Sequence, residues 1–146
     1  MENMFDYKTI DAVKRILKDY PYRIEDVLNS LSEKQQISKD WLVEKLNEYK
    51  HPYRNKLKKD RITIAVLCSW YGLLAYKLIE KFNAKQLDRI HCVDFDPKSK
   101  QISNRLFRKI DNNNLYKGIL TQVKYWEKDI NDMPEKILEE SEIVIN

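Results

Sequence analysis

Hydrophobic positions follow a helical period in the first third of the chain. From residue 7 to residue 50, apolar residues recur three and four positions apart, which predicts helices. Pro21 closes the first predicted helix, and Ser38 is a suitable N-cap for the third. The apolar positions that carry this pattern are Ile10, Val13, Ile16, Leu17, Ile24, Val27, Leu28, Leu31, Trp41, Leu42, Leu46 and Tyr49. We therefore expect a helical N-terminal cap over residues 1–50.

From residue 61 the pattern changes to short apolar runs that alternate with amphipathic segments. The predicted strands are 62–68, 90–94, 119–125 and 143–145, and the predicted helices between them are 73–82, 97–110 and 134–139. Residues 62–68 are apolar on both faces, as in a central parallel strand. Asp96 and Pro97 suit the N-cap and the first position of the second of these helices.

This alternation predicts an α/β fold with right-handed crossovers and a parallel sheet. In a Rossmann-like, doubly wound arrangement the four strands have the order 3-2-1-4. The expected organisation is a helical cap (1–50), a basic connector (51–60) and a Rossmann-like cofactor-binding core (61–146).

Composition narrows the class of protein. The chain has 146 residues, of which 42% are hydrophobic and 34% charged, a balance typical of a globular domain. It contains neither an apolar run of about 18 residues for a membrane helix nor a secretory h-region near its start. Cys68 and Cys92 both fall in predicted strands, where we expect them to be small buried hydrophobic residues. These features favour a cytoplasmic protein.

Residues 50–61 form a basic stretch with one aromatic residue, Tyr53. Two interpretations of this stretch stay open: a contact with the nucleic-acid backbone, in which the tyrosine stacks on a base, or a solvated linker before the first strand. The net charge of +4 permits either. The basic residues are Lys50, Arg54, Lys56, Lys58, Lys59 and Arg61.

The loop after the first predicted strand, residues 68–72, lies where such sheets bind ligands. Only Gly72 could let bare backbone approach a pyrophosphate, and Trp70 and Tyr71 are bulky, which argues against NAD and FAD. The P-loop pattern is also missing. Asp94 follows Gly72 by 22 residues and ends the second strand, at about the spacing of 20 expected for a ribose ligand. Asp129, just after the third strand, could accept the exocyclic amine of an adenine.

At these residues the chain resembles the front portion of a class I S-adenosylmethionine-dependent methyltransferase. The segment VLCSWYGLLA is similar to the glycine-rich first motif, with Cys68 and Trp70 in place of the first two glycines and Gly72 as the third. The tryptophan–tyrosine version of the loop resembles phage-encoded members. Ser69 and Tyr71 complete the cofactor loop that the resemblance implies.

Three further segments extend the resemblance over residues 61–146. VDFDP is similar to the second motif, which implies that Asp94 is the ribose ligand with Phe95 beside it. WEKDI is similar to the third, which implies that Asp129 binds the adenine while Ile130 packs on its ring. EIVIN resembles the start of the fourth strand, with Asn146 where the family often begins its catalytic or substrate-facing motif.

The resemblance implies a methyltransferase that uses S-adenosylmethionine and transfers its methyl group to an unidentified acceptor. An aromatic ring of Trp70 or Tyr71 could face the sulfonium cation. Two alternatives stay open: a cofactor-binding protein that is non-catalytic or incomplete, and a nucleic-acid-binding module that uses residues 50–61. The family has three further strands, so we expect a truncated or short form. Its fourth-strand edge would be covered by the N-terminal helices, by self-association or by a partner chain. His51 and His91 have no partner pattern that suggests a metal.

Overall fold

A computed structural model describes residues 7–57, 61–82, 86–108 and 123–146 of the chain. The first third is helical and consists of α1 (Tyr7–Asp19), the 3-10 turn η1 (Pro21–Arg23), α2 (Ile24–Ser30) and α3 (Glu33–Leu57). The strands and helices that follow alternate: β1 (Ile62–Leu67), α4 (Leu73–Lys81), β2 (Leu87–Asp94), α5 (Pro97–Arg108), β3 (Val123–Glu127), the 3-10 turn η4 (Ile130–Asp132), α6 (Glu135–Glu140) and β4 (Ile143–Ile145).

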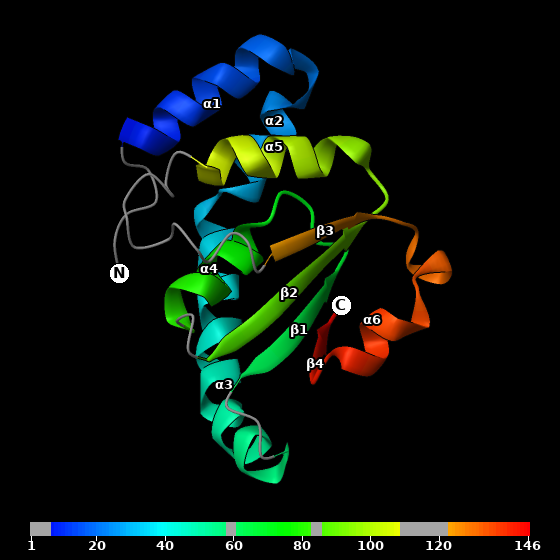
Figure 1. Cartoon of the computed structure of the whole chain (residues 1–146). Helices are drawn as coiled ribbons and strands as arrows, with labels where there is room; N and C mark the ends of the chain where they lie inside the picture. Colours follow the sequence, from blue (N-terminus) through cyan, green and yellow to red (C-terminus); the bar gives the residue numbers. More distant parts are fainter. Residues whose placement is uncertain (1–6, 58–60, 83–85, 109–122) are drawn as a thin grey trace.

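The four strands form one parallel sheet with the order β3-β2-β1-β4 (Figure 1). The predicted α/β, Rossmann-like class and the strand order are therefore confirmed. β1 is central and pairs with β2 from Thr63↔Arg89 to Leu67↔Val93. It also pairs with β4, up to Val66↔Ile145. Because all strands are parallel, their carboxyl ends share one edge of the sheet.

Two apolar clusters hold this arrangement together. The first lies between one face of the sheet and helices α3 and α4; among its buried members are Val43, Ile64, Leu78, Phe82 and Ile90. The second joins α1 and α2 to α5 and to the loop after β1; it consists of Ile16, Val27, Leu31, Tyr71, Leu73, Ile102 and Leu106. Figure 1 shows α1, α2 and α5 as a layer beyond the carboxyl ends of the strands, with α6 on the other side of the sheet from α3 and α4. The N-terminal helices are thus packed directly against the loop that the sequence singles out.

The third helix differs from its prediction at both ends. It begins at Glu33, not near Ser38, because the Ser32 hydroxyl accepts a hydrogen bond from the Gln35 N–H (3.4 Å) and caps it there. Ser38 lies inside the helix and donates to the carbonyl of Gln35 (3.1 Å). At the other end the helix continues to Leu57, so residues 51–57 are helical.

The later elements agree with their predictions within a few residues. β2 begins earlier than predicted, at Leu87, and α6 is shifted by one residue. β3 covers Val123–Glu127, and the predicted start of this strand at residues 119–122 lies outside the described residues. The Asp96 side chain accepts from the Lys98 N–H (2.9 Å), which confirms it as the N-cap of α5.

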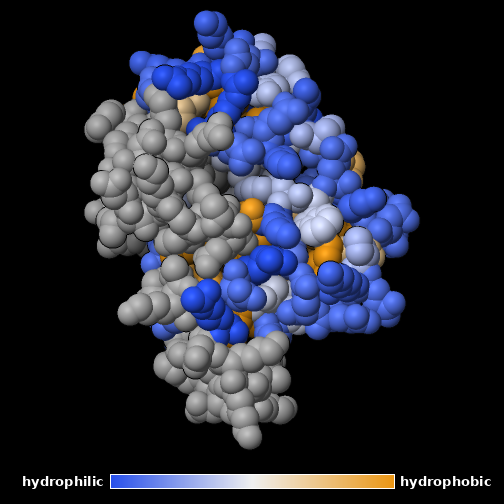
Figure 2. Space-filling model, viewed as in Figure 1, coloured by the Kyte–Doolittle hydropathy of each residue, from blue (hydrophilic) through white to orange (hydrophobic). Residues whose placement is uncertain are grey.

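The surface in Figure 2 is largely hydrophilic, and hydrophobic residues appear on it only in small separate areas. In the part of the chain that the structure describes, no helix combines the length and apolar character needed to cross a membrane.

Candidate functional site

The carboxyl ends of the strands bring the predicted site residues to one edge of the sheet. The Ser69 N–H donates to the Val93 carbonyl (3.1 Å), so the loop after β1 begins beside the end of β2. The Lys128 N–H donates to the Asp94 carbonyl (3.1 Å), which places the segment leading to Asp129 beside the same end. β4 runs parallel to β1 with Ile145 opposite Val66, so Asn146 follows at the same edge.

Every second residue of the loop, at positions 68, 70 and 72, has a left-handed backbone. The φ angles are 54° at Cys68, 53° at Trp70 and 84° at Gly72. Glycine takes such angles freely, whereas other residues in this region are strained by roughly 1–2 kcal/mol each. These are the three positions that the resemblance in sequence aligns with the glycines of G-x-G-x-G, and the backbone at each of them has an angle that glycine takes freely.

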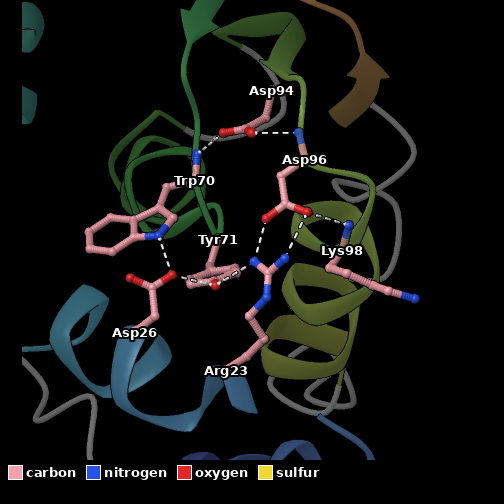
Figure 3. Close-up of polar contacts among 7 residues, drawn as sticks. All are labelled: Arg23, Asp26, Trp70, Tyr71, Asp94, Asp96 and Lys98. Atoms are coloured by element: carbon pink, nitrogen blue, oxygen red, sulfur yellow. Dashed lines mark hydrogen bonds and ion pairs between the residues drawn. The ribbon is translucent and has the colours of Figure 1, made fainter.

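The Asp94 carboxylate fixes the strained part of this loop. Its Oδ2 accepts a hydrogen bond from the Trp70 N–H at 2.9 Å, across the ends of β1 and β2 (Figure 3). Its Oδ1 accepts from the Asp96 N–H at 3.0 Å. Each carboxylate oxygen has capacity for a further donor, so these bonds leave room for the hydroxyls of a ribose.

The side chains of Trp70 and Tyr71 face the N-terminal helices. Trp70 donates from Nε1 to Oδ2 of Asp26 (3.1 Å), and the Tyr71 hydroxyl donates to the same oxygen (2.5 Å). Tyr71 is only 1% exposed and belongs to the second apolar cluster. Burial and the hydrogen bond to Asp26 raise the pKa of Tyr71 to about 12. The Tyr71 ring is therefore a core side chain, and a ligand at this edge would meet only its backbone.

An ion pair closes the same group of residues. Arg23 donates to both carboxylate oxygens of Asp96, from Nη1 to Oδ2 and from Nη2 to Oδ1, the latter at 3.2 Å. Nη1 also donates to the Tyr71 hydroxyl (3.3 Å). The hydrogen bonds from Arg23 hold the pKa of Asp96 below its usual range.

Arg23 and Asp26 belong to this site but were not predicted from the sequence. Arg23 lies 73 residues before Asp96, and no local pattern links the two. The one available signal was indirect: the polar groups of Trp70 and Tyr71 need hydrogen-bond partners where these rings are buried.

Two apolar side chains at this edge are open to solvent. Phe95 is 75% exposed and directly follows Asp94, while Ile130 is 41% exposed and directly follows Asp129. Asp129 is itself exposed, and its Oδ1 accepts from the N–H (2.9 Å) and the side-chain amide (3.0 Å) of Asn131, as the cap of η4. Asn146 is also exposed. The edge thus offers carboxylates next to uncovered apolar groups, an arrangement that suits a ring with polar substituents.

The two cysteines differ in their exposure to solvent. Cys92 is buried, as predicted, and burial raises the pKa of its thiol to about 12. Cys68 is exposed, so the prediction that it is a buried hydrophobic residue was wrong. β1 ends at Leu67, so Cys68 is not part of the strand. The left-handed backbone at Cys68 turns the chain out of the sheet at this residue. Ser69 is buried in its place; its Oγ has no hydrogen-bond partner among the described residues.

Most side chains of the basic stretch, residues 50–61, lie outside the part of the chain that the structure describes. Lys58 and Lys59 are outside the described residues, and Lys50, Arg54 and Lys56 lie on α3, where their side chains are not described. Among the side chains that the structure describes, no group of three or more histidine, cysteine or acidic residues is arranged to hold a metal ion.

Comparison with known proteins shows a distant likeness in structure. No protein-family model matches the chain, and no curated protein matches it. Among solved structures, it is similar to a provisionally assigned S-adenosyl-L-methionine-dependent methyltransferase from Methanococcus maripaludis, with 15% sequence identity and a TM-score of 0.39. The match covers 69% of this chain and 43% of that one, so this chain spans less than half the length of that protein. A likeness of this size implies neither a ligand nor a reaction for this chain.

Proposed function

We propose that this chain binds S-adenosylmethionine at the carboxyl ends of β1 and β2 and acts in methyl transfer. One observation carries the proposal: Cys68, Trp70 and Gly72, the positions that resemble the glycines of G-x-G-x-G, all have positive φ angles, and the Asp94 carboxylate is hydrogen-bonded to that loop. A loop of this form at the end of the first strand of a β3-β2-β1-β4 sheet stands where such folds hold an adenosyl group.

The parts of the cofactor fit the residues at this edge. Asp94 would accept the two ribose hydroxyls with the free lone pairs of its carboxylate. Phe95 and Ile130 would cover the faces of the adenine, and Asp129 would accept its exocyclic amine. Cys68 and Trp70 carry side chains at two positions where a dinucleotide loop has glycine for close approach of a pyrophosphate, which favours a cofactor without phosphates over NAD or FAD.

The methyl transfer itself would rest mainly on positioning. The acceptor would attack the sulfonium methyl in line, and holding the two groups together supplies much of the rate. Asn146, at the same edge, would orient an acceptor amine with its side-chain oxygen. A cofactor-binding protein that needs a partner chain for catalysis is the second candidate, because the Asn146 side chain cannot take a proton from the acceptor.

Calorimetry with S-adenosylmethionine and S-adenosylhomocysteine tests the proposal. We expect binding to the wild-type chain and at least about a tenfold loss of affinity in Asp94→Asn, which removes a charged acceptor. Asp88→Asn, the same change at the other end of β2, is the matched control and should bind as the wild type does. A folded wild-type chain that gives no heat with either ligand would overturn the cofactor proposal. Equal affinity of the wild type and Asp94→Asn would overturn the ribose assignment.

A methyl-transfer assay separates the two candidates. The chain is incubated with S-adenosylmethionine labelled in its methyl group, and with tRNA, DNA or small amines as acceptors. Label in any acceptor supports the enzyme, whereas binding without transfer to any of them supports the binding protein.

A further inference from the structure

The N-terminal helices donate two charged side chains to the loop after β1. Arg23 ends η1 and Asp26 lies in α2, and both contact Tyr71 through its hydroxyl (Figure 3). Asp26 also accepts from the indole of Trp70, and Arg23 also pairs with Asp96, two residues beyond Asp94. The helices therefore contact the loop on one side of the candidate site and the start of α5 on the other.

The loop needs such support, because two of its left-handed positions are not glycine. A strained backbone persists only where its surroundings hold it in place. From within the sheet, Asp94 holds the Trp70 N–H and Val93 holds the Ser69 N–H. From outside the sheet, the Asp26 carboxylate holds the side chains of both bulky residues, Trp70 and Tyr71.

We propose that Asp26 and Arg23 are positioning residues of the cofactor site: they hold the Trp70–Tyr71 loop and the Asp94–Asp96 turn in the form that binds the adenosyl group. This inference rests on the proposed function. Neither residue touches the cofactor; Asp26 acts through Trp70 and Tyr71, and Arg23 acts through Tyr71 and Asp96. The N-terminal helical segment is then part of the cofactor site and not merely a cover for the sheet.

Binding linkage gives the inference a consequence in both directions. If the helices favour the binding form of the loop, a ligand that favours the same form must stabilise the docked helices by an equal free energy. Bound S-adenosylhomocysteine should therefore slow hydrogen exchange in α2. The same ligand should shift the indole N–H signal of Trp70 in a nitrogen–proton spectrum, where Trp70→Phe identifies that signal.

The experiment compares S-adenosylhomocysteine affinity in the full-length wild type and four full-length variants. Asp26→Ala removes both hydrogen bonds to the loop, and we expect about a tenfold loss of affinity. Asp26→Asn keeps an acceptor oxygen and should stay within about threefold of the wild type. Glu25→Ala removes an exposed carboxylate from the same helix and should bind as the wild type does. Tyr71→Phe removes only the shared hydroxyl and supplies a second probe if Asp26→Ala does not fold.

The outcomes distinguish a failure of the positioning role from a failure of the proposed function. A lower affinity in Asp26→Ala or Tyr71→Phe, together with loss of the ligand's protection of α2, supports the positioning role. Wild-type affinity in these variants, with only a lower unfolding temperature, overturns it and leaves the proposed function standing. No binding to the folded wild-type chain overturns the proposed function, and the inference falls with it.

Discussion

Cys68 and Trp70 share a left-handed backbone, with φ angles of 54° and 53° two residues apart in the loop after β1. Only Ser69 separates them, and Gly72 follows with the third positive φ. The alternation lets the Ser69 N–H bond to Val93 of β2, while the Trp70 N–H bonds to the Asp94 carboxylate. The loop is therefore shaped by hydrogen bonds to β2, which take the place of glycine's conformational freedom.

The strain at Cys68 predicts that Cys68→Gly stabilises the protein. A left-handed residue other than glycine costs roughly 1–2 kcal/mol, and the greater freedom of glycine in the unfolded chain costs about 0.5–1 kcal/mol. We expect a gain of about 0.5–1 kcal/mol in the free energy of unfolding, measured by urea denaturation. Ser69→Gly is the matched control, because Ser69 has no positive φ, and it should lose stability. A Cys68→Gly protein less stable than the wild type would contradict the strain.

The exposed thiol of Cys68 provides a chemical probe of the loop. Cys68 should react with iodoacetamide in the native protein, while Cys92 should not, because it is buried and burial raises its pKa to about 12. Saturating S-adenosylhomocysteine should slow the labelling of Cys68 by covering the strand ends. Mass spectrometry of the labelled chain measures the rate, and Cys68→Ser should remove the fast-reacting thiol. A labelling rate that the ligand does not change would show that the ligand binds elsewhere.

The parts of the site that the sequence predicts are those set by local pattern. The apolar run before residue 68 and the position of Asp94 at the end of the next strand follow from hydrophobic periodicity, and the strand order follows from right-handed crossovers. These features need no knowledge of which distant side chains meet. The cap at Asp96 is local as well, since its carboxylate bonds to an N–H two residues away.

The parts that escaped prediction depend on contacts across long stretches of chain. Arg23 meets Asp96 and Asp26 meets Tyr71 only because the second apolar cluster brings α1 and α2 onto α5 and the loop. The start of α3 was missed for a different reason. Ser32 and Ser38 are both acceptable N-caps by residue type, and residue type alone does not show that Ser32 is the one that caps the helix.

His91 of β2, which is hydrogen-bonded to Glu140 of α6, should make stability depend on pH. His91 is 1% exposed, and its Nδ1 accepts from the indole of Trp126 (2.9 Å), so the neutral ring donates from Nε2 to Glu140 (2.5 Å). Burial lowers its pKa, assisted by Arg89 and Lys124 and opposed by Glu140. Protonation would also place a second N–H against the indole N–H of Trp126.

The direction of this pH effect follows from the lowered pKa. Below the ordinary pKa of about 6.5 the unfolded chain binds a proton at this histidine and the folded chain does not. Stability should therefore be unaffected by His91 above about pH 7. It should fall as the pH drops below 6.5, by at most about 1.4 kcal/mol per pH unit. Urea denaturation between pH 7.5 and 5 measures it. The fall should be smaller in His91→Gln, and an equal fall in both proteins would contradict the prediction.

The ion pairs that join α3 to α4 should differ in their value to stability. Lys77 is 6% exposed and pairs with Asp40 at 2.6 Å, whereas Lys81 and Glu44, one turn further along each helix, pair at 2.7 Å with both side chains well exposed. Asp40→Ala leaves the buried ammonium of Lys77 without its partner, which should cost about 2–3 kcal/mol of unfolding free energy. Glu44→Ala removes an exposed pair and should cost less than about 1 kcal/mol.

The two variants make a matched comparison, because each removes one carboxylate of α3 from a lysine of α4. Urea denaturation at neutral pH gives both values. Lys77→Met in the Asp40→Ala background should recover part of the loss, because it replaces the unpaired buried charge with an apolar side chain of similar length. Equal costs for Asp40→Ala and Glu44→Ala would show that the ammonium of Lys77 reaches water once its partner is gone. The Lys77–Asp40 ion pair would then stabilise the packing of α3 on α4 no more than an exposed pair does.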